Sequence, residues 1–358
     1  MSAATPIETK LVVVLGPGGV GKTTTAAALA TAMAKQGFKT VVMTVDPARR
    51  LAQAMGLKDL SDEAQLVKKY PNGQVDALWL SEKGALEALA TKHAPNEESL
   101  RKMLNHKFFR IIESQLGGIE EYLGIEKALT LVNQNEYDFC ILDTPPSQHA
   151  LDFFDSPQHL LEFFDESILK HFTHSEEKKK NWVFKAFSIG KDKIIELFQT
   201  LLGKSFFNDL ASLLALLRPL YTALKATAEQ AQSLLKSEKC SYVLVGVLEP
   251  HPVDEINYLN AMLNAKQLSK QRYWLANKTL PTSPPPKKAL LTKLVGSKRA
   301  TLITHLASQQ ENLLKKIASE TKLPDASALL PCYSIKDFNI ERLEIMGEEA
   351  IKQWKMKL

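Results

Sequence analysis

Residues 11–35 read LVVVLGPGGVGKTTTAAALATAMAK. The apolar run at 11–15 is typical of a strand that is buried on both faces in a parallel sheet. The run 22–35 is rich in alanine and other good helix formers, and Gly37 stands where a helix end favours a left-handed residue. The sequence therefore predicts a buried strand, a glycine-rich turn and a helix in direct succession.

The turn at residues 16–23, Gly-Pro-Gly-Gly-Val-Gly-Lys-Thr, fits the pattern G-x-x-x-x-G-K-[ST]. Glycines let successive backbone N–H groups point at phosphates, and the next helix offers its positive N-terminus. We expect Lys22 to contact the β- and γ-phosphates, Thr23 to coordinate Mg²⁺ and Thr24 to donate to the α-phosphate. The turn thus predicts binding of ATP with Mg²⁺. We expect the backbone N–H groups of Gly18, Gly19, Val20 and Gly21 to line the phosphates as well.

Two further predicted strands end in an acidic residue followed by proline. The strand at 40–45 leads into Asp46-Pro47, and the strand at 139–142 leads into Asp143-Thr144-Pro145-Pro146. Ligands of open α/β sheets bind at the carboxyl ends of the strands, so both carboxylates should lie near the turn at 16–23. Other strands are expected at 77–80, 242–248, 273–276 and 328–330, and helices at 48–55, 97–133 with a break near 117–118, 253–264, 297–321 and 340–357.

The pattern as a whole predicts an α/β fold of the P-loop NTPase class, with a mostly parallel sheet flanked by helices. No strand pattern occurs between residues 149 and 236, where the apolar periodicity at 194–202 and 210–224 favours helices. We therefore expect a core domain formed by 1–148 and 237–358, and a helical insertion subdomain formed by 149–236. Residues 281–286 hold four prolines and predict an extended connector.

Composition excludes several classes of protein. With 45% hydrophobic and 24% charged residues the chain is globular, and its net charge of +5 is scattered, so no nucleic-acid partner is expected. The three cysteines lie far apart and predict neither a disulfide framework nor a zinc site. The first ten residues carry no apolar leader and no later run is long enough to span a bilayer, so we expect a cytoplasmic protein with at most peripheral membrane contact.

Four segments together resemble the ArsA-type ATPases, a P-loop family with a deviant phosphate loop. They are GPGGVGKTTT from Gly16, VDPARRLAQAMGL from Val45, QLGGIEEYLGIEK from Gln115 and DTPPSQHALDFF from Asp143. The family includes arsenite-efflux ATPases and the ATPase that delivers tail-anchored membrane proteins, and this chain looks like a bacterial-type member. The resemblance implies an ATP-hydrolysing dimeric switch whose nucleotide state is coupled to a helical subdomain that binds a cargo or partner protein.

The resemblance also implies roles for three residues. Asp46 matches the acidic residue of the first switch, which orients the attacking water near Mg²⁺ and would be catalytic together with Lys22. Asp143 matches the second switch, where the carboxylate holds Mg²⁺ through water. Asn277 ends the strand at 273–276 and resembles the residue that reads adenine. The alternatives are a helix cap for Asp46 and turn positions for Asp143 and Asn277.

The chain departs from the family at Pro17, where the phosphate loop normally carries a lysine that reaches the partner subunit's phosphates. A homodimer should then hydrolyse ATP slowly, while a heterodimer with a paralogous ATPase that keeps the lysine would not. No C-x-x-C pair and no arsenite-binding cysteine set are present, so direct arsenite transport is not expected. His171 and His174 lack further ligands and do not predict a metal site.

The predicted insertion is rich in phenylalanine and leucine, which leaves two interpretations open. The side chains could form a groove for a hydrophobic helical cargo, or they could pack the core of the subdomain. Two other classes stay open as well: a catalytically weak regulatory subunit, and a partitioning ATPase of the ParA/MinD type, which usually lacks such an insertion. The side chains concerned are Phe153, Phe154, Leu160, Leu161, Phe163, Phe164, Phe184, Phe187, Phe198, Leu201, Leu202, Phe206 and Phe207.

Overall fold

A computed structural model describes most of the chain, in several separate stretches. The chain divides into two compact units, one of residues 1–81, 124–153 and 231–358, the other of 82–123 and 154–230. Most of the predicted insertion 149–236 lies outside the described residues, so its boundaries stay a prediction. The described residues are 10–45, 48–80, 85–107, 109, 119–146, 154–156, 204–280, 288–320, 327–333 and 339–354.

The first unit is built on an eight-stranded sheet in the order β3-β4-β2-β5-β1-β6-β7-β8. All neighbouring strands are parallel except β3 and β4, which form an antiparallel hairpin at one edge. The predicted α/β fold with a mostly parallel sheet is thereby confirmed. The strands are β1 Lys10–Leu15, β2 Lys39–Thr44, β3 Gln65–Lys69, β4 Gln74–Trp79, β5 Phe139–Asp143, β6 Cys240–Val247, β7 Arg272–Thr279 and β8 Ser327–Pro331.

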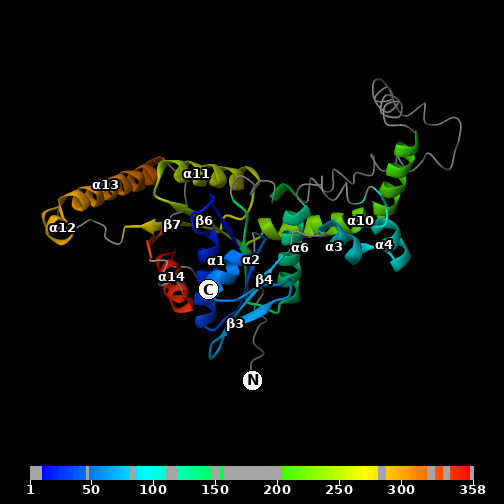
Figure 1. Ribbon diagram of the computed structural model, residues 1–358, viewed down its shortest axis with the longest axis horizontal. Helices are drawn as coiled ribbons and strands as arrows, with labels where there is room; N and C mark the ends of the chain where they lie inside the picture. Colours follow the sequence, from blue (N-terminus) through cyan, green and yellow to red (C-terminus); the bar gives the residue numbers. More distant parts are fainter. Residues whose placement is uncertain are drawn as a thin grey trace. The chain divides into compact units, whose positions relative to one another are not determined.

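Among the helices of the described residues, α1, α11 and α14 contact strands of this sheet (Figure 1). Helix α10 contains the periodic segment 210–224, whereas the segment 194–202 and the proline-rich connector 281–286 lie outside the described residues. The helices are α1 Lys22–Lys35, α2 Ala48–Met55, α3 Ala85–His93, α4 Glu97–Leu104, α6 Ile119–Gln134, α10 Lys204–Lys236, α11 Pro250–Ala265, α12 Lys288–Val295, α13 Ser297–Glu320 and α14 Ile340–Trp354.

The helical segment expected at 97–133 has an interruption that was not predicted, because α4 ends at Leu104 and residues 105–107 are not helical. The expected break near 117–118 lies outside the described residues, and α6 begins at Ile119. Elements α3, α12 and β3 were not predicted. Strand β3 is an edge strand with exposed and charged positions, and such a strand lacks the apolar run that marks a buried one.

The helix that follows the glycine-rich turn, α1, is buried on nearly all sides, which explains its high alanine content. It lies beside α14, as the blue and red helices of Figure 1 show. At their crossing, Gly347 of α14 approaches so closely that a methyl group there would overlap the backbone oxygen of Ala28 and the Cβ atom of Ala32. Small residues on both helices thus let the two backbones pack in direct contact, and this contact with α14 holds α1 in position.

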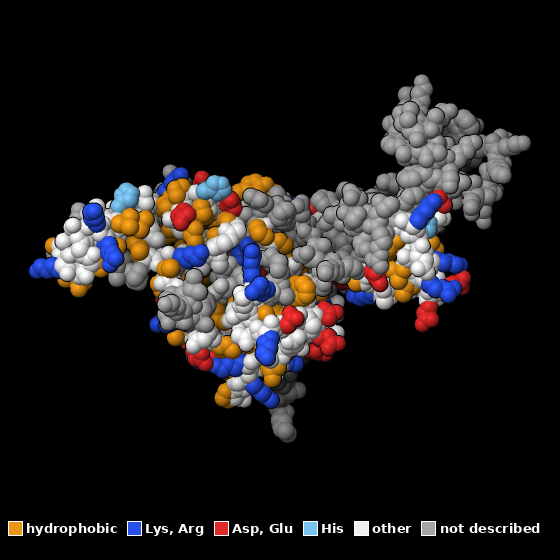
Figure 2. Space-filling model, viewed as in Figure 1, with side chains coloured by type: hydrophobic (Ala, Val, Ile, Leu, Met, Phe, Trp, Pro, Cys, Tyr) orange, Lys and Arg blue, Asp and Glu red, His pale blue; other side chains and the backbone are white. Residues whose placement is uncertain are grey.

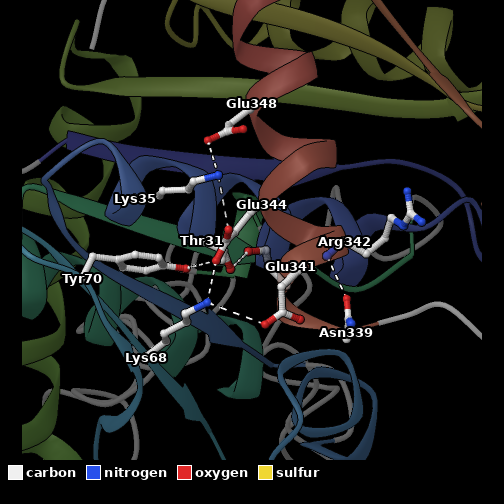
Figure 3. Close-up of polar contacts among 10 residues, drawn as sticks. Thr31, Lys35, Lys68, Tyr70, Asn339, Glu341, Arg342, Glu344 and Glu348 are labelled. Carbon is white, nitrogen blue, oxygen red and sulfur yellow. Dashed lines mark hydrogen bonds and ion pairs between the residues drawn. The ribbon is translucent and has the colours of Figure 1, made fainter.

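A second contact of α14 is polar and centres on the buried carboxylate of Glu344 (Figure 3). Its Oε1 atom accepts hydrogen bonds from Lys68 Nζ at 2.7 Å and from Tyr70 Oη at 2.8 Å, and Lys35 Nζ lies 3.3 Å from Oε2. Burial opposes ionisation of this carboxyl, but the three donors outweigh it and hold the pKa of Glu344 below its usual value. The cluster joins α14 to α1 and to the edge strand β3.

Replacing Glu344 with glutamine is expected to lower the free energy of unfolding at pH 7 by about 2 kcal/mol, the scale of buried hydrogen bonds to a charged group. Because the pKa of Glu344 is depressed in the folded protein, its contribution is complete above the unfolded pKa and is lost as the pH falls through the folded pKa. The difference between wild type and variant in urea unfolding should therefore shrink in acid. Glu341→Gln is the matched control, since that side chain is 67% exposed and 3.9 Å from Lys68; a difference independent of pH would contradict the assignment.

Within the part of the chain that the structure describes, no helix combines the length and apolar character needed to cross a bilayer.

Candidate nucleotide-binding site

The glycine-rich turn between β1 and α1 adopts a backbone that other residues rarely accept. Gly16 has φ 156° and Gly21 has φ 103°. A Cβ atom at Gly16 would overlap the carbonyl oxygen of Val245 in β6, and one at Gly21 would overlap the side-chain amide of Asn277 in β7. Both positions therefore require glycine for conformation and for space, and the turn is seated against two neighbouring strands.

Lys22 is the first residue of α1 and is buried. Its Nζ atom donates a hydrogen bond to the carbonyl oxygen of Pro17 at 3.0 Å, across the turn. This contact holds the ammonium group against the loop backbone. Pro17 is itself buried, and its contribution here is a backbone oxygen that any residue at this position would provide.

The ends of three elements meet at the carboxylate of Asp143, the last residue of β5. Its Oδ2 atom accepts hydrogen bonds from Thr23 Oγ1 of α1 at 2.7 Å and from Thr44 Oγ1 of β2 at 3.0 Å. The next residue, Thr144, donates to the carbonyl oxygen of Val14 in β1 at 2.8 Å. Parallel pairing of β5 with both β1 and β2 brings these groups to one edge of the sheet.

The end of β7 also contacts the turn. Asn277 Nδ2 donates to the carbonyl oxygen of Val20 at 2.9 Å, and its Oδ1 accepts from the backbone N–H of Lys278 at 2.9 Å. Lys278 has φ 56°, and its ammonium group donates to the carbonyl oxygen of Gly19 at 2.8 Å. Two consecutive residues therefore bind two consecutive carbonyls of the turn, and we call this pair of contacts the β7 clamp.

Replacing Lys278 with asparagine is expected to raise the dissociation constant for ATP about fivefold, the equivalent of one hydrogen bond. Asparagine tolerates the left-handed backbone, so the change removes the ammonium group without adding strain. Calorimetric titration with ATP and Mg²⁺ would measure the change. Lys270→Asn, at an exposed lysine ahead of β7, is the control, and equal affinities of wild type and Lys278→Asn would show that the clamp does not organise the turn.

The structure brings together most of the predicted site residues. Lys22, Thr23, Asp143 and Asn277 all lie at or against the turn, and Thr24 follows in the first turn of α1. Asp46 lies outside the described residues, although its strand β2 ends at Thr44 beside Asp143. Thr44, Thr144 and Lys278 were not predicted from the sequence. Thr44 could have been found, because it is a polar residue at the end of an apolar strand.

The donor groups fit a magnesium–nucleotide ligand. Mg²⁺ prefers oxygen ligands and commonly takes one or two from the protein beside phosphate oxygens and water. The hydroxyl of Thr23 and the carboxylate of Asp143 are adjacent oxygens of this kind. Among the described residues no group of three His, Cys, Asp or Glu side chains is placed to hold a metal ion.

The model of the anion-transporting ATPase family, ArsA ATPase, matches residues 9–300. The chain belongs to this family. It is 31% identical to the ATPase ASNA1 homolog 2 of Paramecium tetraurelia over 41% of this chain and 44% of that protein, and 31% identical to the ATPase get3 of Aspergillus niger over 40% of this chain and 41% of that protein. With the ATPase ASNA1 homolog of Babesia bovis it shares 27% identity over 66% of this chain and 65% of the relative.

Membership of the ArsA ATPase family confirms the resemblance drawn from the four segments. The expected enzyme class, an ATPase, and the expected nucleotide ligand are those of the family. The chain spans less than half the length of the first relatives that it matches.

Proposed function

We propose that this chain hydrolyses ATP with Mg²⁺ and that its nucleotide state opens and closes a dimer. The observation that carries the proposal is the 2.7 Å contact between Thr23 Oγ1 and Asp143 Oδ2, beside a turn in which Gly16 and Gly21 have no room for a side chain. This contact supports the proposal because it joins the hydroxyl expected to bind Mg²⁺ to the carboxylate that the resemblance assigns to the second switch. Loop and carboxylate are 120 residues apart in sequence, so the fold must assemble them.

Each group at the site has a role in phosphoryl transfer. Lys22 neutralises charge on the β- and γ-phosphates, the backbone N–H groups of 18–21 bind the phosphate oxygens, and Thr23 with Asp143 holds the metal ion. Mg²⁺ supplies further charge neutralisation when bound. Asp46 orients the attacking water, and Asn277 reads the adenine base in addition to its contact with the turn.

Coupling to a larger motion requires contacts that differ between two nucleotide states. Thr144 anchors the residue after Asp143 to β1. The resemblance to the family implies that the segment after Pro146 responds to the γ-phosphate. We propose that this segment transmits the change to the helical subdomain 149–236, which binds a hydrophobic helical segment of a cargo or partner protein. A location in the cytoplasm fits this activity.

The test is ATP turnover by the purified chain, measured beside its sedimentation with and without nucleotide. Asp46→Asn should slow turnover about a hundredfold, as loss of a group that positions or activates the nucleophile does. ATP binding and the ATP-dependent increase in sedimentation should persist in this variant. Turnover that is unaffected by Asp46→Asn would refute the catalytic assignment.

The same assay decides what Pro17 does. If the chain is a homodimer, turnover should be slow and should rise in Pro17→Lys, which restores the cation that reaches the partner's phosphates. If turnover rises only when a paralogous ATPase is added, the active form is a heterodimer. If ATP binds but none of these conditions gives turnover, the chain is a regulatory subunit and not an enzyme.

A further inference from the structure

Helices α12 and α13 carry a surface that the nucleotide site does not use. Four leucines lie exposed on the two helices, at 52% for Leu290, 70% for Leu294, 58% for Leu302 and 40% for Leu306. In each helix the two leucines are four residues apart and so share one face. The two helices contact each other, and the side chains that they bury are different ones, namely Leu291, Ala300, Ala307 and Ile317.

Cations accompany these leucines on the same faces. Lys293 lies three residues after Leu290, and Lys298 and Arg299 lie four and three residues before Leu302. All three cations are exposed, and among the described residues none of them pairs with a carboxylate. The sequence from 281 to 310 contains no Asp or Glu. We call the four leucines with these three cations the basic leucine surface.

Figure 2 shows α12 and the start of α13 on the left. Orange apolar and blue basic side chains lie next to one another there, and no red acidic side chain is visible among them. Exposed apolar groups rimmed by cations are the signature of a surface that enters the boundary between lipid headgroups and acyl chains. The cations then lie at the level of the anionic headgroups.

We infer that the basic leucine surface binds an anionic lipid bilayer. The charge argues against a second copy of this chain as the occupant, because a two-fold contact would place the same three cations of each subunit against those of the other. An anionic bilayer meets both requirements at once, since it accepts the leucines and neutralises Lys293, Lys298 and Arg299. The inference does not depend on ATP hydrolysis or on cargo binding.

The experiment is flotation of the full chain with vesicles. The chain should float with phosphatidylcholine vesicles that contain about 30 mol% phosphatidylglycerol, and it should not float with pure phosphatidylcholine. Raising the salt to about 0.5 M should weaken binding, since exposed charges are then screened. Leu294→Ser with Leu302→Ser, and separately Lys293→Glu with Lys298→Glu, should each reduce vesicle affinity at least about tenfold.

Matched controls lie elsewhere on the chain. Leu66→Ser removes a leucine that is 55% exposed on β3, and Lys225→Glu with Lys270→Glu reverses two exposed lysines outside the two helices. Both controls should float as the wild type does. Absence of flotation with anionic vesicles, or equal loss in controls and variants, would overturn the inference. So would leucine variants that keep vesicle binding and change only the sedimentation coefficient, because the surface would then join two copies of the chain.

Discussion

ATP turnover is expected to fall about a thousandfold when Lys22 is replaced with alanine, because the change removes the cation that neutralises the transferring phosphate. The structure supports this expectation through position. Lys22 opens the helix behind the turn, is buried and is held across the turn by the carbonyl oxygen of Pro17 at 3.0 Å. Its charge is therefore already oriented at the turn where we propose that phosphate binds, and little reorganisation would be needed when the transition state forms.

Steady-state turnover and calorimetric ATP binding would separate the two effects of Lys22→Ala. The dissociation constant for ATP should also rise, since the ammonium group contacts phosphates in the ground state. Lys10→Ala is a suitable control, because Lys10 is exposed and lies at the start of β1, whereas the turn follows the end of β1. Unchanged turnover and unchanged binding in Lys22→Ala would refute the nucleotide site.

Replacing Gly347 with alanine is expected to lower the free energy of unfolding by about 3 kcal/mol, the upper range for overpacking a core. In most helices the same change is stabilising by about 0.5–1 kcal/mol, so even its sign is informative. The new methyl group would overlap the backbone oxygen of Ala28, which no rotamer change can move. Helices α1 and α14 would have to separate, and α1 carries Lys22 and Thr23 at its start.

Denaturant unfolding would measure the loss of unfolding free energy in Gly347→Ala. Ile345→Ala tests an exposed position of the same helix and should cost little. Adding Ala32→Gly should recover only part of the loss, since it relieves the contact with the Ala32 side chain and leaves the contact with the Ala28 backbone. A Gly347→Ala variant as stable as wild type would show that the two helices are less closely packed than described.

Several elements were predictable because their signals are local. The strand, turn and helix of residues 11–35 are a continuous pattern, and α1 begins and ends at the expected residues, 22 and 35. Asp143 was predicted at the end of a buried strand and lies there. By contrast, β3 and α12 were missed, since the former is a polar edge strand and the latter a short helix with several exposed apolar positions.

The contacts that organise the candidate site were not readable in the same way. Asn277 was expected at a strand end, but nothing in the sequence indicated that its amide would bind the Val20 carbonyl, 257 residues earlier, or that Lys278 would bind that of Gly19. The order of the strands decides these contacts, because β6 and β7 must follow β1 in the sheet before β7 can end beside the turn.

The sequence by itself determined that this chain has a phosphate-binding loop, a parallel sheet and a carboxylate at a strand end. These features arise from hydrogen bonding and burial over a few neighbouring residues. Only the tertiary structure decided which carbonyl each donor meets, why residue 347 must be glycine, and that the leucines of α12 and α13 remain exposed. Periodicity shows which side of an element is apolar, but what covers that side depends on segments hundreds of residues away.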